Sequence, residues 1–172
     1  MVSIARTILN AMPQVTRGAR LRIVPKLATP VGSEAIALGD GPNEMRHIPG
    51  HALNRSGLCL LIVNAGVETA VAAEIGLMGR LGRPRVTMRE PLLHDARPWP
   101  RHLEPGDSVV AYFASSIKHH SVLAQMRQAF VVDDDGRMFT AASPALTYFV
   151  REYAEGGRGR LLLLLGPPRR AS

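Results

Sequence analysis

The residues of this chain that could perform nucleophilic chemistry are one cysteine, Cys59, and six histidines. A cysteine that a histidine base deprotonates is an effective nucleophile. Cys59, however, lies within the continuous apolar run Leu58–Val63, where a thiol behaves as a small apolar side chain with a raised pKa. We therefore predict that Cys59 is buried and unreactive. A single cysteine also excludes an internal disulfide and a multi-cysteine zinc site.

The histidines do not form a recognisable metal-binding motif. His47 and His51 have the spacing of helical ligands, but a proline and a glycine stand between them, so no helix can present both. Neither this pair nor His119-His120 has a cluster of Cys, Asp or Glu at ligand spacing. We expect no metal site.

The acidic run Asp133-Asp134-Asp135-Gly136 superficially resembles a calcium loop. Such a loop requires alternate acidic ligands and a distant bidentate glutamate. Here the acids are consecutive, so their side chains would point apart, and we predict a hairpin turn instead. The chain also has no glycine-rich phosphate loop and no paired carboxylates at helical or strand spacing. We expect no catalytic residue and no cofactor.

The chain is basic, with a net charge of +7, and 19 of its 21 basic residues are arginine. Arginine matches phosphate geometry better than lysine does, and Gly156–Arg160 resembles a nucleic-acid-binding tail, although a linker is the favoured interpretation of one copy without aromatics. Polyanion binding is therefore the alternative function. Its candidate residues are Arg17, Arg20, Arg22, Arg158, Arg160, Arg169 and Arg170.

Two apolar segments near the ends indicate contacts with other subunits. Residues 3–12 have the spacing of a short helix, in an arm that is either solvated or packed on a neighbour. Leu161–Leu165 are too few to span a bilayer, and five leucines in water would cause aggregation. They suit a buried strand that completes this chain's sheet, which we favour, or extends a neighbour's. The candidate partner-binding residues are Ile4, Ile8, Leu9, Trp99, Leu161, Leu162, Leu163, Leu164 and Leu165.

The central segments have the sequence patterns of strands. These strands would position any site. The apolar run Leu58–Val63 predicts an inner strand. Asn64-Ala65-Gly66 predicts a tight turn, because asparagine and glycine tolerate positive φ. Val67–Leu77 alternates with period two, with mostly apolar residues at its odd positions and both acids, Glu68 and Glu74, on the other side. A helix would instead place Glu74 within the apolar stripe. We therefore predict a half-buried strand.

The remaining elements follow from local signals. Arg20–Val24, followed by a proline, predicts an edge strand. Ser143-Pro144 predicts the start of a helix that ends at Gly156-Gly157. Further strands are expected at 35–38, 86–88, 108–113, 130–132 and 138–139, a further helix at 117–128, and irregular loops at 39–57 and 91–105.

Three turn motifs suggest a family resemblance over residues 58–140. They are I-V-N-x-G at Ile62–Gly66, L-x-P-G-D-S at Leu103–Ser108 and V-x-D-x-D-G-R-x-F at Val131–Phe139. In these motifs the region resembles an immunoglobulin-like β-sandwich module of bacterial and phage proteins of unassigned function. The resemblance implies a fold; the motifs specify turns and carry no chemistry.

We therefore expect a mainly β protein, an immunoglobulin-like antiparallel sandwich of seven or eight strands with two or three peripheral helices. The expected organisation is a basic arm at 1–19, the sandwich at 20–157 and a tail at 158–172. The expected function is a non-enzymatic structural or interaction subunit of an assembly, with protein partners, a homo-oligomer included, and no membrane. Its setting would be the cytoplasm or a virion such as a phage particle. A weaker alternative is an enzyme with a site in loops 39–57 and 91–105.

Overall fold

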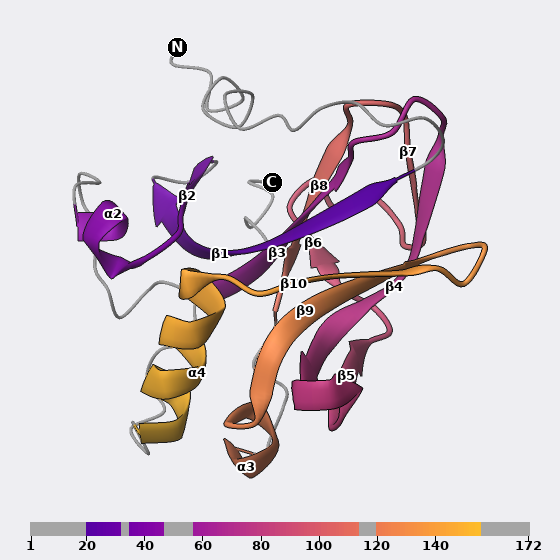
Figure 1. Cartoon of the computed structure of the whole chain (residues 1–172). Coiled ribbons are helices and arrows are strands. Elements are labelled where there is room, and N and C mark those ends of the chain that lie inside the picture. The colour runs from indigo at the N-terminus through magenta and orange to yellow at the C-terminus, as the bar shows by residue number, and fades with distance from the viewer. Residues whose placement is uncertain (1–19, 32–34, 47–56, 114–119, 156–172) are drawn as a thin grey trace.

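Two antiparallel β-sheets pack face to face in the computed structural model, which describes residues 20–31, 35–46, 57–113 and 120–155 (Figure 1). The first sheet has the order β2-β1-β3-β8-β6, and the second has the order β10-β9-β4-β5 with β7 also beside β4. The mainly β, sandwich-like architecture is confirmed. The strands are β1 (Leu21–Val31), β2 (Ala35–Gly39), β3 (Gly57–Asn64), β4 (Ala70–Gly79), β5 (Arg85–Met88), β6 (Leu92–Leu93), β7 (Arg101–Leu103), β8 (Ser108–Tyr112), β9 (Met126–Asp133) and β10 (Met138–Ala141).

Strand β3 is the central strand of the first sheet, as its unbroken apolar sequence predicts. It pairs with β1 on one side and β8 on the other. Its alternate residues Leu58, Leu60 and Ile62 are fully buried in the main core, which they share with residues of the second sheet such as Ile75 and Leu77. Side chains from both sheets thus interdigitate, which is the source of most of the hydrophobic stabilisation of a sandwich.

Strand β4 confirms the predicted strand, but its two halves bury opposite sets of positions. Ala70 and Ala72 are buried in the first half, whereas Ile75 and Leu77 are buried in the second. The register against β9 shifts between Ala72 and Glu74, which is a β-bulge. A bulge inserts one residue and reverses the alternation beyond it. The predicted alternation is therefore interrupted at Ala73: the even positions Ala70 and Ala72 belong to the main core before it, and the odd positions Ile75 and Leu77 belong to it afterwards.

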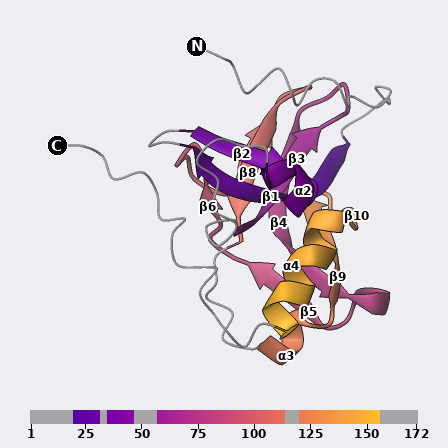
Figure 2. The ribbon, with the colours of Figure 1, turned by 90° about the vertical axis from the view of Figure 1, so that its left-hand side faces the viewer.

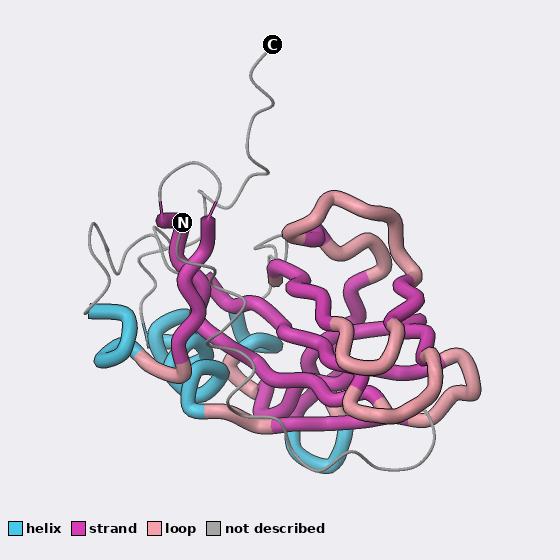
Figure 3. The backbone as a smooth tube through the Cα atoms, turned by 90° about the horizontal axis from the view of Figure 1, so that it is seen from above, coloured by secondary structure: helices cyan, strands magenta, loops and turns pink. Residues whose placement is uncertain are grey.

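The helices gather at one side of the sandwich (Figure 3). Helix α4 (Pro144–Glu155) contacts β1, β3 and β9, and Figure 2 brings it to the front below β1 and β2. Its predicted start is confirmed, because the Ser143 hydroxyl accepts a hydrogen bond from the Leu146 backbone N–H at 3.1 Å. The other two helices are α2 (Pro42–Arg46) and α3 (His120–Leu123), and a 3₁₀ turn spans Arg80–Gly82. No helix within the described residues is long and apolar enough to cross a membrane.

Two local predictions are wrong because tertiary pairing overrides local preference. The predicted helix at 117–128 is replaced at its end by β9, which begins at Met126 and pairs with β4. The loop predicted at 91–105 contains β6 and β7. The edge strand predicted at Arg20–Val24 is confirmed locally, because this part of β1 pairs with β3 alone. Pro25 is tolerated because β2 pairs only from Leu27 onward, so one side of β1 is unpaired there.

Several predictions lie outside the described residues. These include the helix at 3–12, residues 47–56 of the first loop, and the strand at Leu161–Leu165. The chain has ten strands in its described part, two or three more than predicted. The additional ones, β6 and β7, are only two and three residues long, which is too short to show an alternating pattern.

Candidate functional site

Asn64 joins two of the predicted turns at one end of the sandwich. Its side chain is fully buried, and its amide donates to the carbonyl oxygens of Glu68 at 2.7 Å and Leu103 at 2.9 Å. Its side-chain oxygen accepts from the Gly66 N–H at 3.0 Å, which forms an Asx turn. Every polar atom of the amide group is thus engaged. The turn is confirmed, but it uses this hydrogen bond and not the expected positive φ at Asn64 or Gly66.

The two turns that Asn64 joins present carboxylates and one exposed apolar side chain. We define the acidic turns as Val67, Glu68, Glu104 and Asp107. Val67 is 50% exposed, and the Thr69 hydroxyl donates to Glu104 Oε2 at 2.9 Å, which links the two turns directly. None of the three carboxylates forms an ion pair within the part of the chain that the structure describes.

The β4–β5 hairpin presents the opposite charge. We define its basic tip as Arg80, Leu81, Gly82 and Arg83. The hairpin closes through a hydrogen bond from the Gly79 N–H to the Pro84 carbonyl at 2.7 Å. Leu81 is 98% exposed and has φ 60° and ψ 26°. Among the described residues, neither arginine of the tip has an ion-pair partner.

The outer face of the second sheet supports the hairpin behind its tip. Gly76 faces Phe130 across the β4–β9 pairing, and a Cβ at Gly76 would lie 2.8 Å from two atoms of the Phe130 ring. The Phe130 side chain covers this glycine and is itself fully buried. The Arg85 guanidinium stacks 4.2 Å from the ring centroid and pairs with Glu74. Arg85 is therefore engaged in the fold, unlike the arginines of the tip.

Trp99 fills a break in the edge of the second sheet. β7 pairs with β4 at residues 70–72 and β5 pairs at 75–78, so the backbone between them lacks a partner strand on that side. The Trp99 indole N–H donates to the Ala73 carbonyl at 3.0 Å, at the bulge, and its ring packs on the main core. An open depression of about 390 Å³ lies beside Ala73 and Glu74, and its remaining lining is Thr87, Met88 and Arg89. A partner contact through Trp99 remains a prediction.

Cys59 is fully buried, as predicted. Burial raises the pKa of its thiol to about 12, an effect that Lys26 partly opposes. Its cross-strand neighbour Tyr112 also has its pKa raised to about 12, first by burial and then by the thiol. The histidine of this region, His94, places Nδ1 3.0 Å from the Tyr112 hydroxyl. The thiol therefore lacks the lowered pKa of a catalytic cysteine.

The run of three aspartates forms the predicted hairpin turn. Asp133 is only 4% exposed, and its Oδ1 accepts from the Arg137 N–H at 2.8 Å. The Arg137 Nε lies 3.2 Å from Asp133 Oδ2, and Gly136 has φ 77°. These contacts stabilise the turn from within. Among the described residues, no three His, Cys, Asp or Glu side chains are grouped as metal ligands would be.

The residues predicted as binding sites are only partly covered by the structure. Arg20 and Arg22 are exposed at the start of β1, where the Arg20 carbonyl accepts from the Ala65 N–H at 2.9 Å, beside the acidic turns. β1 belongs to the first sheet, whereas Trp99 contacts β4 of the second sheet. The other candidates lie outside the described residues, namely Ile4, Ile8, Leu9, Arg17, Arg158, Arg160, Leu161–Leu165, Arg169 and Arg170.

The basic tip could not be recognised from the sequence. The signal was present as three arginines and one leucine between 80 and 85, but a leucine in a turn carries no information about its exposure.

No family model, curated protein or solved structure matches the chain.

Proposed function

We propose that the chain is a non-enzymatic protein-interaction subunit of a larger assembly. The observation that carries this proposal is Leu81, an almost fully exposed leucine held in a left-handed conformation. That conformation costs a non-glycine residue about 1 kcal/mol, and glycine or asparagine would fit the turn better. Burial of a leucine side chain contributes about 1.5–3 kcal/mol, so a partner that covers Leu81 more than offsets the cost.

The rest of the sandwich suits a rigid scaffold that presents turns. Two of its buried polar side chains, Asn64 and Asp133, form hydrogen bonds that fix those turns. Cys59, the one nucleophile candidate, is buried with a raised pKa. A cytoplasmic assembly or a virion, such as a phage particle, would each supply protein partners for such a subunit.

Site-specific crosslinking in the producing cell tests this function. A photoreactive amino acid at position 81 of the full chain is expected to yield a discrete protein adduct, because the proposal places this side chain against a partner protein. The same group at Glu152, exposed on α4, is the matched control and should give none. Equal adduct yields at both positions would show that Leu81 is ordinary solvent-exposed surface.

Polyanion binding is the second candidate, and the distribution of charge favours it. The described residues contain 13 Lys and Arg and 13 Asp and Glu, so they are balanced. The remaining eight basic residues and one acidic residue account for the whole net charge of +7. The positive charge therefore resides outside the described part of the chain, where most of the predicted polyanion-binding arginines lie.

Titration with DNA at several salt concentrations tests the second candidate. The expected result is measurable binding whose logarithm falls linearly with the logarithm of salt concentration. Alanine at Arg158, Arg160, Arg169 and Arg170 should weaken binding uniformly across sequences and reduce the slope by about 1 for each arginine that no longer neutralises a phosphate. An unchanged slope in this variant would contradict binding through the tail.

A further inference from the structure

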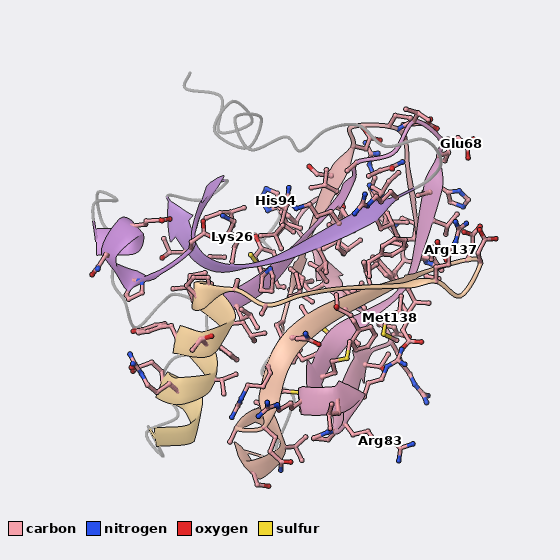
Figure 4. All side chains as sticks on the ribbon, in the orientation of Figure 1. Lys26, Glu68, Arg83, His94, Arg137 and Met138 are labelled. Atoms are coloured by element: carbon pink, nitrogen blue, oxygen red, sulfur yellow. The ribbon has the colours of Figure 1, made fainter. Side chains whose placement is uncertain are left out.

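The two ends of strand β4 carry matching exposed apolar side chains. The described residues include three large hydrophobic side chains that are exposed, and two of them are Val67 at 50% and Leu81 at 98%. Val67 precedes β4 and Leu81 follows it, so the length of the strand separates them. Figure 4 labels Glu68 at the upper right and Arg83 at the bottom, near the two ends of β4.

The charges around these two side chains are opposite. Arg80 and Arg83 flank Leu81 in the basic tip, and Glu68, Glu104 and Asp107 belong to the same acidic turns as Val67. None of these five charged side chains forms an ion pair within the described residues. Each end thus combines an apolar side chain with charged side chains that form no ion pair among the described residues, and the two sets of charges are opposite in sign.

We propose that the partner of the basic tip is the pair of acidic turns on a second copy of this chain, so that copies join head to tail. This proposal rests on the proposed function and names its partner. Leu81 of one copy contacts Val67 of the next, and Arg80 and Arg83 face the carboxylates. Such a contact is heterologous, and its repetition gives an open chain or a closed ring. A symmetric pairing of two tips would instead bring arginines together.

The contact is small and therefore weak on its own. Four tip residues against two turns bury much less than the roughly 1,200 Å² of a stable interface. Its attraction is mainly between exposed charges, which salt screens over about 8 Å at physiological ionic strength. Association therefore occurs at high protein concentration and low salt, and decreases as salt is added.

Sedimentation velocity of the full chain with two charge-reversal variants tests this contact. One variant combines Arg80→Glu with Arg83→Glu, and the other combines Glu68→Arg with Glu104→Arg. The wild-type protein is expected to show salt-sensitive association that rises with concentration. Each variant alone should be monomeric, because its two ends carry charge of the same sign. An equimolar mixture should associate again, because each reversed end then meets a complementary one.

Two further variants separate this contact from other causes. Arg151→Glu reverses an exposed charge on α4 and should associate like wild type. Leu81→Ser removes the apolar centre and should weaken association by about tenfold or more while keeping its salt dependence, a change of about 1.4 kcal/mol. Unfolding curves establish that every variant is folded. Failure of the mixed variants to recover association would overturn the head-to-tail contact.

The outcomes also distinguish this contact from the broader function. A wild-type protein that is monomeric at every concentration and salt overturns the head-to-tail contact, whereas a crosslink from position 81 to a different protein would still support an interaction subunit. Nucleic acid is the other occupant that the tip arginines could bind. DNA binding that the tip variant loses and the turn variant keeps, in a protein that stays monomeric, also overturns the contact.

Discussion

The backbone of Leu81 has φ 60° and ψ 26°, a region in which a side chain with a Cβ is crowded by its own carbonyl group. Nothing in the hairpin requires leucine there, because the side chain is 98% exposed. A residue that is both strained and solvated contributes little to the stability of the isolated fold. The proposed contact with a second copy would explain its apolar character.

Leu81→Asn should therefore stabilise the isolated protein while it weakens association. Asparagine adopts positive φ more readily than leucine, so the free energy of unfolding should rise by about 0.5–1 kcal/mol. Denaturation midpoints measure the first effect, and sedimentation velocity measures the second. A midpoint at or below that of the wild type would contradict the strain at this residue.

Cys59 makes stability sensitive to alkaline pH. Burial raises the pKa of its thiol from 9.0 to about 12 in the folded protein, so the unfolded chain releases the proton first. The stabilisation is thus complete below pH 9 and is lost as pH rises from 9 toward 12, by up to about 1.4 kcal/mol per pH unit. Tyr112 adds a similar loss above pH 10.

Cys59→Ala isolates this effect. The variant should be less stable at neutral pH, because it leaves a small cavity, but its unfolding free energy should fall less steeply between pH 9 and 10. Denaturant titrations at closely spaced pH values measure the slope. Identical slopes in the two proteins would show that the thiol is not protected from ionisation by the fold.

At the scale of elements, the turns could be predicted because their chemistry is local. Ser143-Pro144 starts a helix, and the aspartate run closes a hairpin at Gly136, as their residue types require. The bulge in β4 could not be predicted, because it depends on the register against β9 and on the break between β5 and β7. Trp99 was named as a candidate, but its hydrogen bond to the bulge carbonyl depends on that same register.

The acidic turns, which form one half of the proposed contact, could not be predicted from the sequence for a related reason. The acidic turns come from segments about 40 residues apart, and only the structure shows that they meet, through the hydrogen bonds of Asn64 and Thr69. The three motifs that indicated a β-sandwich do include Asn64 and Asp107. They were informative for the fold, and their role in presenting charge follows only from the observed pairing.

Asn64→Ala tests how strongly the two turns depend on each other. The substitution leaves the Gly66 N–H and two carbonyl groups without their partner in a buried site. We expect a loss of about 3 kcal/mol or more in unfolding free energy. Thr69→Ala, which removes only the exposed hydrogen bond to Glu104, is the matched control and should cost about 0.5 kcal/mol or less. Similar losses in both variants would show that Asn64 does not join the turns.

At the scale of the whole molecule, the described residues form a sandwich that is neutral overall but divided in charge. The basic tip and the acidic turns lie at opposite ends of β4, whereas the net charge of +7 comes from residues outside this part. Salt therefore acts on two separate processes. It would screen the proposed attraction between the ends of neighbouring copies, and it would weaken any binding of polyanions to the terminal arginines.

Deletion of residues 159–172 tests whether the tail belongs to the sandwich. Among the described residues, the main core already joins strands of both sheets with Leu146, Phe149 and Val150 of α4. We therefore expect the truncated protein to unfold at nearly the same temperature and to keep its head-to-tail association, but to lose most of its polyanion binding. Calorimetry, sedimentation and DNA titration measure the three properties. A collapse of thermal stability would instead show that Leu161–Leu165 pair with this chain's own sheet, the alternative that the sequence alone favours.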